Sequence, residues 1–368
     1  MPTTFELDEF RADLREEPEQ APPEEVRRDL RGRTLDDRAA PLGAALGALS
    51  LVSLLYGRLL PLSGVLGFVI CWYLAFVVLY ALVSIYRHPA PAVTDRIAGV
   101  LIRTSALVVG GALATVITYV FVRGAPALRH LNIFTQDLTA GPHDPLEVGG
   151  VLHGIVGTLI QVGIAISITL PLGVGCAVFM TEVGGKLANL VRTVVEAMTA
   201  LPSIVCGLFV YIALLLTFDV QRNGMAAALA ISVMMLPIIA RSAEVVLRVV
   251  PGGLREASLA LGASQWQTVR KVVLPTARPA LATAMVLGIA RGIGETSPVL
   301  ITAGYTTFLN ANPFEGPMVS LPLFAYTLAR SPEPLFQTRA FGAAAVLMVL
   351  VLLVFLLARL AAAQRRGR

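Results

Sequence analysis

An arginine and a glutamate lie four residues apart in ARGIGETSP, the segment Ala290–Pro298. Side chains at this spacing share one face of a helix, so Arg291 and Glu295 are expected to face the same way. The surrounding hydrophobic stretch, residues 280–303, is long enough to cross a bilayer, and a cation near its middle must pair or face a cavity. A guanidinium is a planar fork that suits oxyanions, so the pair predicts an anion pathway. The alternative is an ion pair that only holds the helices together.

A second polar stretch, LPSIVCG, occupies Leu201–Gly207 inside another hydrophobic segment. Pro202 frees a backbone carbonyl and kinks its helix, and within a membrane the freed groups must face protein or water. Thr199 and Ser203 would then offer hydroxyls to the same pathway. A kink that serves packing alone is the competing interpretation, as it is for Pro171 and Pro237.

The composition indicates an all-α polytopic membrane protein. Hydrophobic residues make up 56% of the 368 residues, charged residues 14%, and the mean hydropathy is +0.74. Most Lys and Arg residues gather near helix ends on one side, which predicts that both termini are cytosolic and gives no sign of nucleic-acid binding. Three cysteines and four scattered histidines lack metal-ligand spacing, so no metal site is expected. The predicted spans are residues 42–60, 62–86, 97–122, 151–180, 190–218, 224–247, 280–303 and 340–362.

Three regions follow from this pattern. Residues 1–40 are rich in charge and proline and are expected to form a disordered cytosolic tail. Residues 41–88 form an N-terminal transmembrane hairpin. Residues 89–368 form the main transmembrane domain, whose cytosolic loop is 248–275.

The cytosolic loop predicts two short helices. In the first, Leu254, Ala257, Ser258 and Leu261 share one small, mostly apolar face. Gly262 stands where a left-handed helix stop belongs, and Ser264 with Gln267 predicts a capping box for a second helix that ends at Pro275. Such a helix could enter a groove on a partner or lie at the membrane surface.

Two resemblances favour the first interpretation. Glu256-Ala257-Ser258, Gly262 and Val272-x-Leu274-Pro275 resemble the EAA loop of ATP-binding-cassette importer permeases. This resemblance implies a coupling helix that docks on an ATPase subunit. The residues that it implicates are Glu256, Ala257, Ser258, Gly262, Leu274 and Pro275.

Several motifs are similar to those of the PstA-type permeases of the phosphate-specific transport system: IVGTL at 155–159, LPLGV at 170–174, PSIV-G at 202–207, ARGIGETSPVL and LPLFAYTLARSPEPL at 321–335. The resemblance implies a type I importer core of six transmembrane helices in the cytoplasmic (inner) membrane, here with two extra N-terminal transmembrane helices. It implies a PstC-type permease, two PstB-type ATPases and a PstS-type phosphate-binding protein as partners, in addition to membrane lipid. It makes inorganic phosphate the substrate and places Arg291, Glu295, Thr296, Ser203 and Thr199 on its pathway.

No ATP-binding loop is apparent, because TEVGGKL at 181–187 lacks the first glycine and the final hydroxyl of that motif. ATP and Mg²⁺ are therefore expected on the partner ATPase, with no cofactor in this chain, which is expected to be a transport subunit and not an enzyme. The alternatives are a permease for another oxyanion such as molybdate or sulfate, an ion-driven secondary transporter, and a membrane sensor or scaffold.

Overall fold

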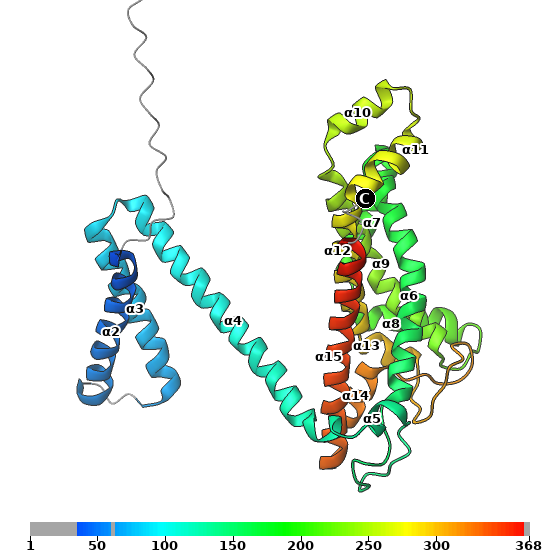
Figure 1. Ribbon diagram of the computed structural model, residues 1–368, viewed down its shortest axis with the longest axis horizontal. Helices are drawn as coiled ribbons and strands as arrows, with labels where there is room; N and C mark the ends of the chain where they lie inside the picture. The colour runs from blue at the N-terminus through cyan, green and yellow to red at the C-terminus, as the bar shows by residue number, and fades with distance from the viewer. Residues whose placement is uncertain (1–34, 60–62, 364–368) are drawn as a thin grey trace, which may run out of the picture. The chain divides into compact units, whose positions relative to one another are not determined.

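The computed structural model describes residues 35–59 and 63–363 (Figure 1). The chain divides into two compact units, Met1–Ala112 and Leu113–Arg368, and the division falls inside helix α4 (Ala90–Leu128). Residues 1–34 of the expected tail 1–40 lie outside the described residues. Residues 35–40 belong to the first helix, α2 (Leu35–Leu54).

The first unit contains a helical hairpin. Helix α2 continues into the π-helical turn η1 (Leu55–Leu59) and packs against α3 (Val65–Arg87). The small side chains Ala44, Ala48 and Val52 recur every fourth residue of α2 and are all buried. Such a stripe lets two membrane helices approach closely, and the Trp72 indole donates a hydrogen bond to the Ala45 carbonyl at 3.1 Å. The hairpin predicted for residues 41–88 thus has an interface of its own.

The second unit is a bundle around one central helix. In α9, 67% of the most apolar stretch is buried, against 28% or less in each of the other six candidate spans among the described residues. The two short helices α10 and α11 lie at one end of this unit, here called the α10 end, and α5 lies at the opposite end, the α5 end (Figure 1). The elements are α5 (Asn132–Thr135), α6 (Leu152–Val178), η2 (Phe179–Val183), α7 (Gly185–Thr199), α8 (Ser203–Val210), η3 (Tyr211–Leu216), α9 (Gly224–Arg248), α10 (Gly252–Ala260), α11 (Gln265–Thr268), η4 (Val269–Val273), α12 (Leu274–Ile293), α13 (Ser297–Thr302), α14 (Leu321–Ala329) and α15 (Pro334–Ala363).

Glycines let the neighbouring helices approach α9. A Cβ at Gly173 of α6 or at Gly288 of α12 would collide with the Ile239 side chain of α9, and one at Gly292 would collide with the Met235 sulfur. Close approach of this kind replaces the hydrophobic driving force that helices lack inside lipid. The result is a tight three-helix centre of α6, α9 and α12.

The number and order of the predicted spans agree with the structure. Among the described residues, seven helices are long and apolar enough to cross a membrane, and the bent pair α7 with α8–η3 makes an eighth if it counts as one span. That pair bends by 105° at Ala200–Pro202, so the bend expected near Pro202 is present. Pro171 and Pro237 instead lie inside the continuous helices α6 and α9.

Two boundary predictions were wrong. Pro275 does not end a helix: α11, η4 and α12 run on as one helix from Gln265 to Ile293, with Pro275 in the first turn of α12. The π-helical turn η4 directly before it accommodates the missing N–H. Arg291 is likewise not at the centre of a helix over 280–303, because α12 ends two residues after it and a new helix, α13, starts at Ser297. Pro298 explains the break, because it has no N–H to donate to the carbonyl of Gly294, four residues earlier, and its ring would clash with that carbonyl in a continuous helix.

The long segment 304–339 turns back into the bundle. It contains α14, in which Leu321, Leu323 and Phe324 are fully buried. The Leu321 amide donates to the Thr158 hydroxyl of α6 at 2.8 Å, and the Gln161 side chain donates to the Met318 carbonyl at 2.8 Å. These bonds satisfy polar groups that lipid could not.

Candidate functional site

Two broken helices meet inside the second unit. Helix α8 follows the bend at Pro202, α13 follows the break after α12, and the two are in contact. A Cβ at Gly207 of α8 would overlap the Pro298 backbone of α13, so glycine is required for this approach. Irregular backbone at membrane depth is tolerated where it is buried in protein or lines a watery cavity. The contact between α8 and α13 is therefore a candidate substrate pathway.

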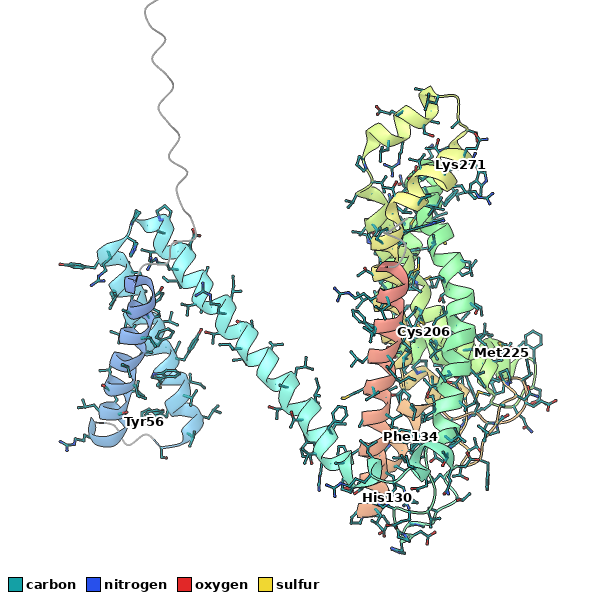
Figure 2. All side chains as sticks on the ribbon, in the orientation of Figure 1. Tyr56, His130, Phe134, Cys206, Met225 and Lys271 are labelled. Carbon is teal, nitrogen blue, oxygen red and sulfur yellow. The ribbon has the colours of Figure 1, made fainter. Side chains whose placement is uncertain are left out.

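Arg291 and Glu295 lie at this contact. The Arg291 Nε atom is 3.8 Å from a Glu295 carboxylate oxygen, so the two side chains face each other, although Glu295 lies in the break after α12 and not on one helix with Arg291 as expected. The Arg291 side chain is 62% exposed and that of Glu295 is 16% exposed. Cys206 of α8 is buried and lies between the two ends of the unit (Figure 2). The charged pair thus lies at the break between α12 and α13, and its guanidinium is open.

The hydroxyl residues predicted for the pathway are only partly brought together. Ser203 is the first residue of α8 and Thr296 directly precedes α13, and both are half-buried on the touching helices. Thr199 ends α7 on the other side of the bend, and its hydroxyl donates to the Glu196 carbonyl at 2.6 Å. Thr199 is therefore already engaged within its own helix.

A charge cluster lies elsewhere on α9 and was not anticipated. Glu244 is 1% exposed and accepts hydrogen bonds from three guanidiniums. The donors are Arg192 of α7 at 2.8 Å, Arg241 at 2.8 Å and Arg248 at 2.6 Å. The spacing of Arg241 and Arg248 to Glu244 on α9 is readable in the sequence, whereas Arg192 is 52 residues away. The cluster fastens α7 to α9.

The α10 end carries the predicted docking helix. Gly262 has φ +83°, and the capping box of Ser264 with Gln267 is present, as predicted. The Ser258 and Thr268 hydroxyls are 2.9 Å apart and join α10 to α11. Figure 2 shows Lys271 at this end of the unit, and His130 and Phe134 at the α5 end.

Several apolar side chains of α10 remain uncovered. Leu254 is 43% and Leu261 is 89% exposed, and both line a groove of about 360 Å³ together with Ala257, Ser258 and Lys271. Exposed apolar surface rimmed by polar residues is typical of a protein contact. Of the other residues predicted for coupling, Glu256 is exposed on α10, while Leu274 and Pro275 are half-buried at the start of α12.

Comparison with known proteins shows which protein family this chain resembles. The profile of the family "Binding-protein-dependent transport system inner membrane component" matches residues 169–367, which include α8 and α10–α13. The phosphate transport system permease protein PstA 1 of Mycobacterium tuberculosis is 41% identical over 222 residues, covering 59% of this chain and 73% of that protein. PstA of Mycobacterium leprae is 36% identical over 260 residues, covering 70% and 85%.

A further relative and a solved structure are also similar to this chain. PstA of Haemophilus influenzae is 34% identical over 250 residues, covering 67% of this chain and 86% of that protein. An inward-facing structure of the MetNI methionine ABC transporter is 25% identical, with a TM-score of 0.46, and covers 58% of this chain and 94% of the solved one. This chain therefore belongs to the family of binding-protein-dependent transport system inner membrane components, as a permease of the PstA type, a membrane transport component and not an enzyme.

Proposed function

We propose that this chain is the transmembrane subunit of an ATP-driven importer that carries inorganic phosphate across the inner membrane. The relatives at 34–41% identity are phosphate transport permeases. The observation that carries the proposal is the open guanidinium of Arg291 at the break between α12 and α13. Glu295 gives this cation only a long, partial pairing at 3.8 Å, and a permeating oxyanion can bind the donors that Glu295 leaves open.

Arg291 is the group that meets the anion. Its 3.8 Å separation from Glu295 is longer than the about 2.7–2.9 Å of a close charge-assisted hydrogen bond, so its donors are available to a ligand. Glu295 orients the guanidinium and pairs with it again once the anion has left. The hydroxyls of Ser203 and Thr296 lie on the two touching helices and add donors for phosphate oxygens, and Thr199 joins them only if it releases the Glu196 carbonyl.

Energy reaches the pathway from the α10 end. A partner ATPase, which binds ATP and Mg²⁺, docks on the exposed face of α10 that carries Glu256, Ala257 and Ser258, and Gly262 sets the angle of that face. Leu274 and Pro275 lie where this segment joins α12, the helix that ends at Arg291. Movement of α10 is thus relayed along one continuous helix to the anion site.

The partners and the orientation follow from this arrangement. The α10 end faces the cytosol, together with both chain termini, and receives two PstB-type ATPases in the complete complex. A homologous PstC-type permease covers the exposed Arg291 side of this chain. A PstS-type phosphate-binding protein delivers phosphate at the α5 end.

Reconstitution in lipid vesicles tests this function. The chain, co-purified with its partner permease and ATPase subunits, is expected to take up phosphate only when ATP and the binding protein are supplied. An uptake that ran on an ion gradient without nucleotide would contradict the ATP-driven importer. Stronger uptake of molybdate or sulfate than of phosphate would reassign the substrate.

Variants of Arg291 test the anion site in the same vesicles. Arg291→Gln removes the charged group that binds the anion. Loss of one partner of such a charge-assisted contact corresponds to a fall of about thirtyfold or more in the uptake rate. Arg291→Lys keeps the charge but not the planar fork of donors, so its uptake rate should lie between those of the unsubstituted chain and Arg291→Gln. Near-normal uptake by Arg291→Gln, in an intact complex, would remove Arg291 from the mechanism.

A further inference from the structure

The position of α10 is not set by core packing. None of its nine residues is fully buried. Its hydroxyl bond from Ser258 to Thr268 reaches only the neighbouring helix α11. Displacement of α10 can reach α12 through α11 and η4, but this bond gives it no route to α6.

One side chain of α10 reaches further. The Arg255 Nε atom lies 3.2 Å from both carboxylate oxygens of Glu182, and Nη2 donates to one of them at 2.8 Å. Glu182 lies in η2, the last turn of the span that begins with α6. The Glu182 side chain is 7% exposed and that of Arg255 is 23% exposed, so water screens this ion pair little.

The same guanidinium also holds the end of α9. Arg255 donates through Nη2 to the Leu247 carbonyl, in the last turn of α9, at 2.9 Å and through Nη1 to the Val250 carbonyl, two residues beyond the helix, at 2.6 Å. The last carbonyls of a helix have no partner within it and carry partial negative charge, so a cation is favourable there. A planar fork can serve a carboxylate and two carbonyls at once, which a lysine ammonium cannot do with the same geometry.

Glu182 is a junction in its own right. The Gln265 side chain of α11 donates to its backbone carbonyl. Gly184 and Gly185 follow closely, with φ +67° and +84°, and they form the turn at which α7 begins. Helix α7 then carries Arg192, which binds Glu244 of α9. Glu182 therefore lies where α6, α7, α10 and α11 meet.

We propose that Arg255 and Glu182 form a coupling bracket, a pair of positioning residues that transmits displacement of α10 to α6 and α9. This inference rests on the proposed function, in which an ATPase docks on α10. With the bracket intact, α10 moves as one body with the ends of two membrane spans. Without it, the ATPase still docks and hydrolyses ATP, but α6 and the end of α9 follow the movement of α10 less well.

The test compares phosphate uptake per ATP hydrolysed in vesicles that contain the complete complex. Four complexes are measured: the unsubstituted chain, Arg255→Gln, Glu182→Gln and the double variant. Each single substitution should lower the ratio by about threefold to thirtyfold while ATPase subunits still co-purify, the range expected for residues that carry coupling between sites. The double variant should lose no more than Arg255→Gln alone, because the ion pair with Glu182 is already absent in that variant. Arg270→Gln, at an exposed arginine of η4, is the matched control and should leave the ratio unchanged.

A normal ratio in either Gln variant, or additive losses in the double variant, would overturn the bracket. If the Gln variants fail to assemble, Arg255→Lys and Glu182→Asp decide, because they keep both charges: the bracket requires a lowered ratio in an assembled complex. Failure of these two to assemble as well would show that the pair serves assembly alone and would equally overturn it. Failure of the unsubstituted complex to take up phosphate would instead contradict the proposed function, and the bracket would fall with it.

Discussion

At the scale of single residues, the second unit relies on carboxylates that each hold more than one element. Glu244 is the clearest case, since it is 1% exposed and three guanidiniums surround it. A buried charge is tolerated only when it is paired and hydrogen-bonded, and here both carboxylate oxygens are occupied. The arginines, by contrast, reach solvent, with exposed fractions of 26% for Arg192, 45% for Arg241 and 55% for Arg248.

We expect Glu244→Gln to destabilise the chain. A neutral amide cannot balance three cations, but the partly exposed arginines can turn to water. The free energy of unfolding should therefore fall by about 1–3 kcal/mol, less than the roughly 3–5 kcal/mol expected when a fully buried ion pair is broken. Unfolding of the purified chain in detergent measures it. Glu196→Gln is the matched control, because Glu196 is 51% exposed and contacts only Arg241 of this cluster, so its effect should stay within about 1 kcal/mol. Equal effects of the two variants would contradict the special role of Glu244.

At the scale of elements, the features that could be predicted were the local ones. The capping box of Ser264 and the left-handed Gly262 depend on residues within one turn, so their pattern is visible in the sequence. The continuous helix from α11 through α12 could not be predicted. Pro275 is also compatible with a helix start, and the turn η4 before it has no sequence signature. The bonds of Arg192 to Glu244 and of Arg255 to Glu182 join residues 52 and 73 positions apart, which no periodicity reveals.

Gly262 provides the test at this scale. Its φ of +83° strains any residue with a Cβ by about 1–2 kcal/mol, although a Cβ there would meet no atom within 4 Å. Gly262→Ala should therefore tilt α10 against α11 and reduce the amount of ATPase that co-purifies, whereas Gly262→Asn should be milder because asparagine tolerates this conformation. Gly253→Ala, at a helical glycine of α10 with equally open surroundings, is the control. If Gly262→Ala and Gly253→Ala behave alike, the angle of α10 does not govern docking.

At the scale of the whole molecule, the transport machinery belongs to the second unit. The family match covers residues 169–367, and the two broken helices, the charged pair and α10 all lie within it. The hairpin of α2 and α3 has its own buried stripe, and many of its large apolar residues point outward, including Leu42, Leu66 and Leu74, as lipid-facing side chains do.

Removing residues 1–88 should accordingly leave phosphate uptake and ATPase co-purification close to those of the full chain. Two spans are lost together, so the remaining helices keep the orientation that their basic residues favour. Removing residues 1–62 deletes α2 alone; Arg87 at the end of α3 then favours an α3 whose new N-terminus lies on the outer side, so this shorter deletion should also leave the second unit correctly oriented and active. Uptake in vesicles and antibody access to a C-terminal tag measure both effects. The longer deletion keeps every residue that is assigned to the pathway and to coupling. If transport is lost although the second unit is still correctly inserted, the hairpin takes part in the transport cycle.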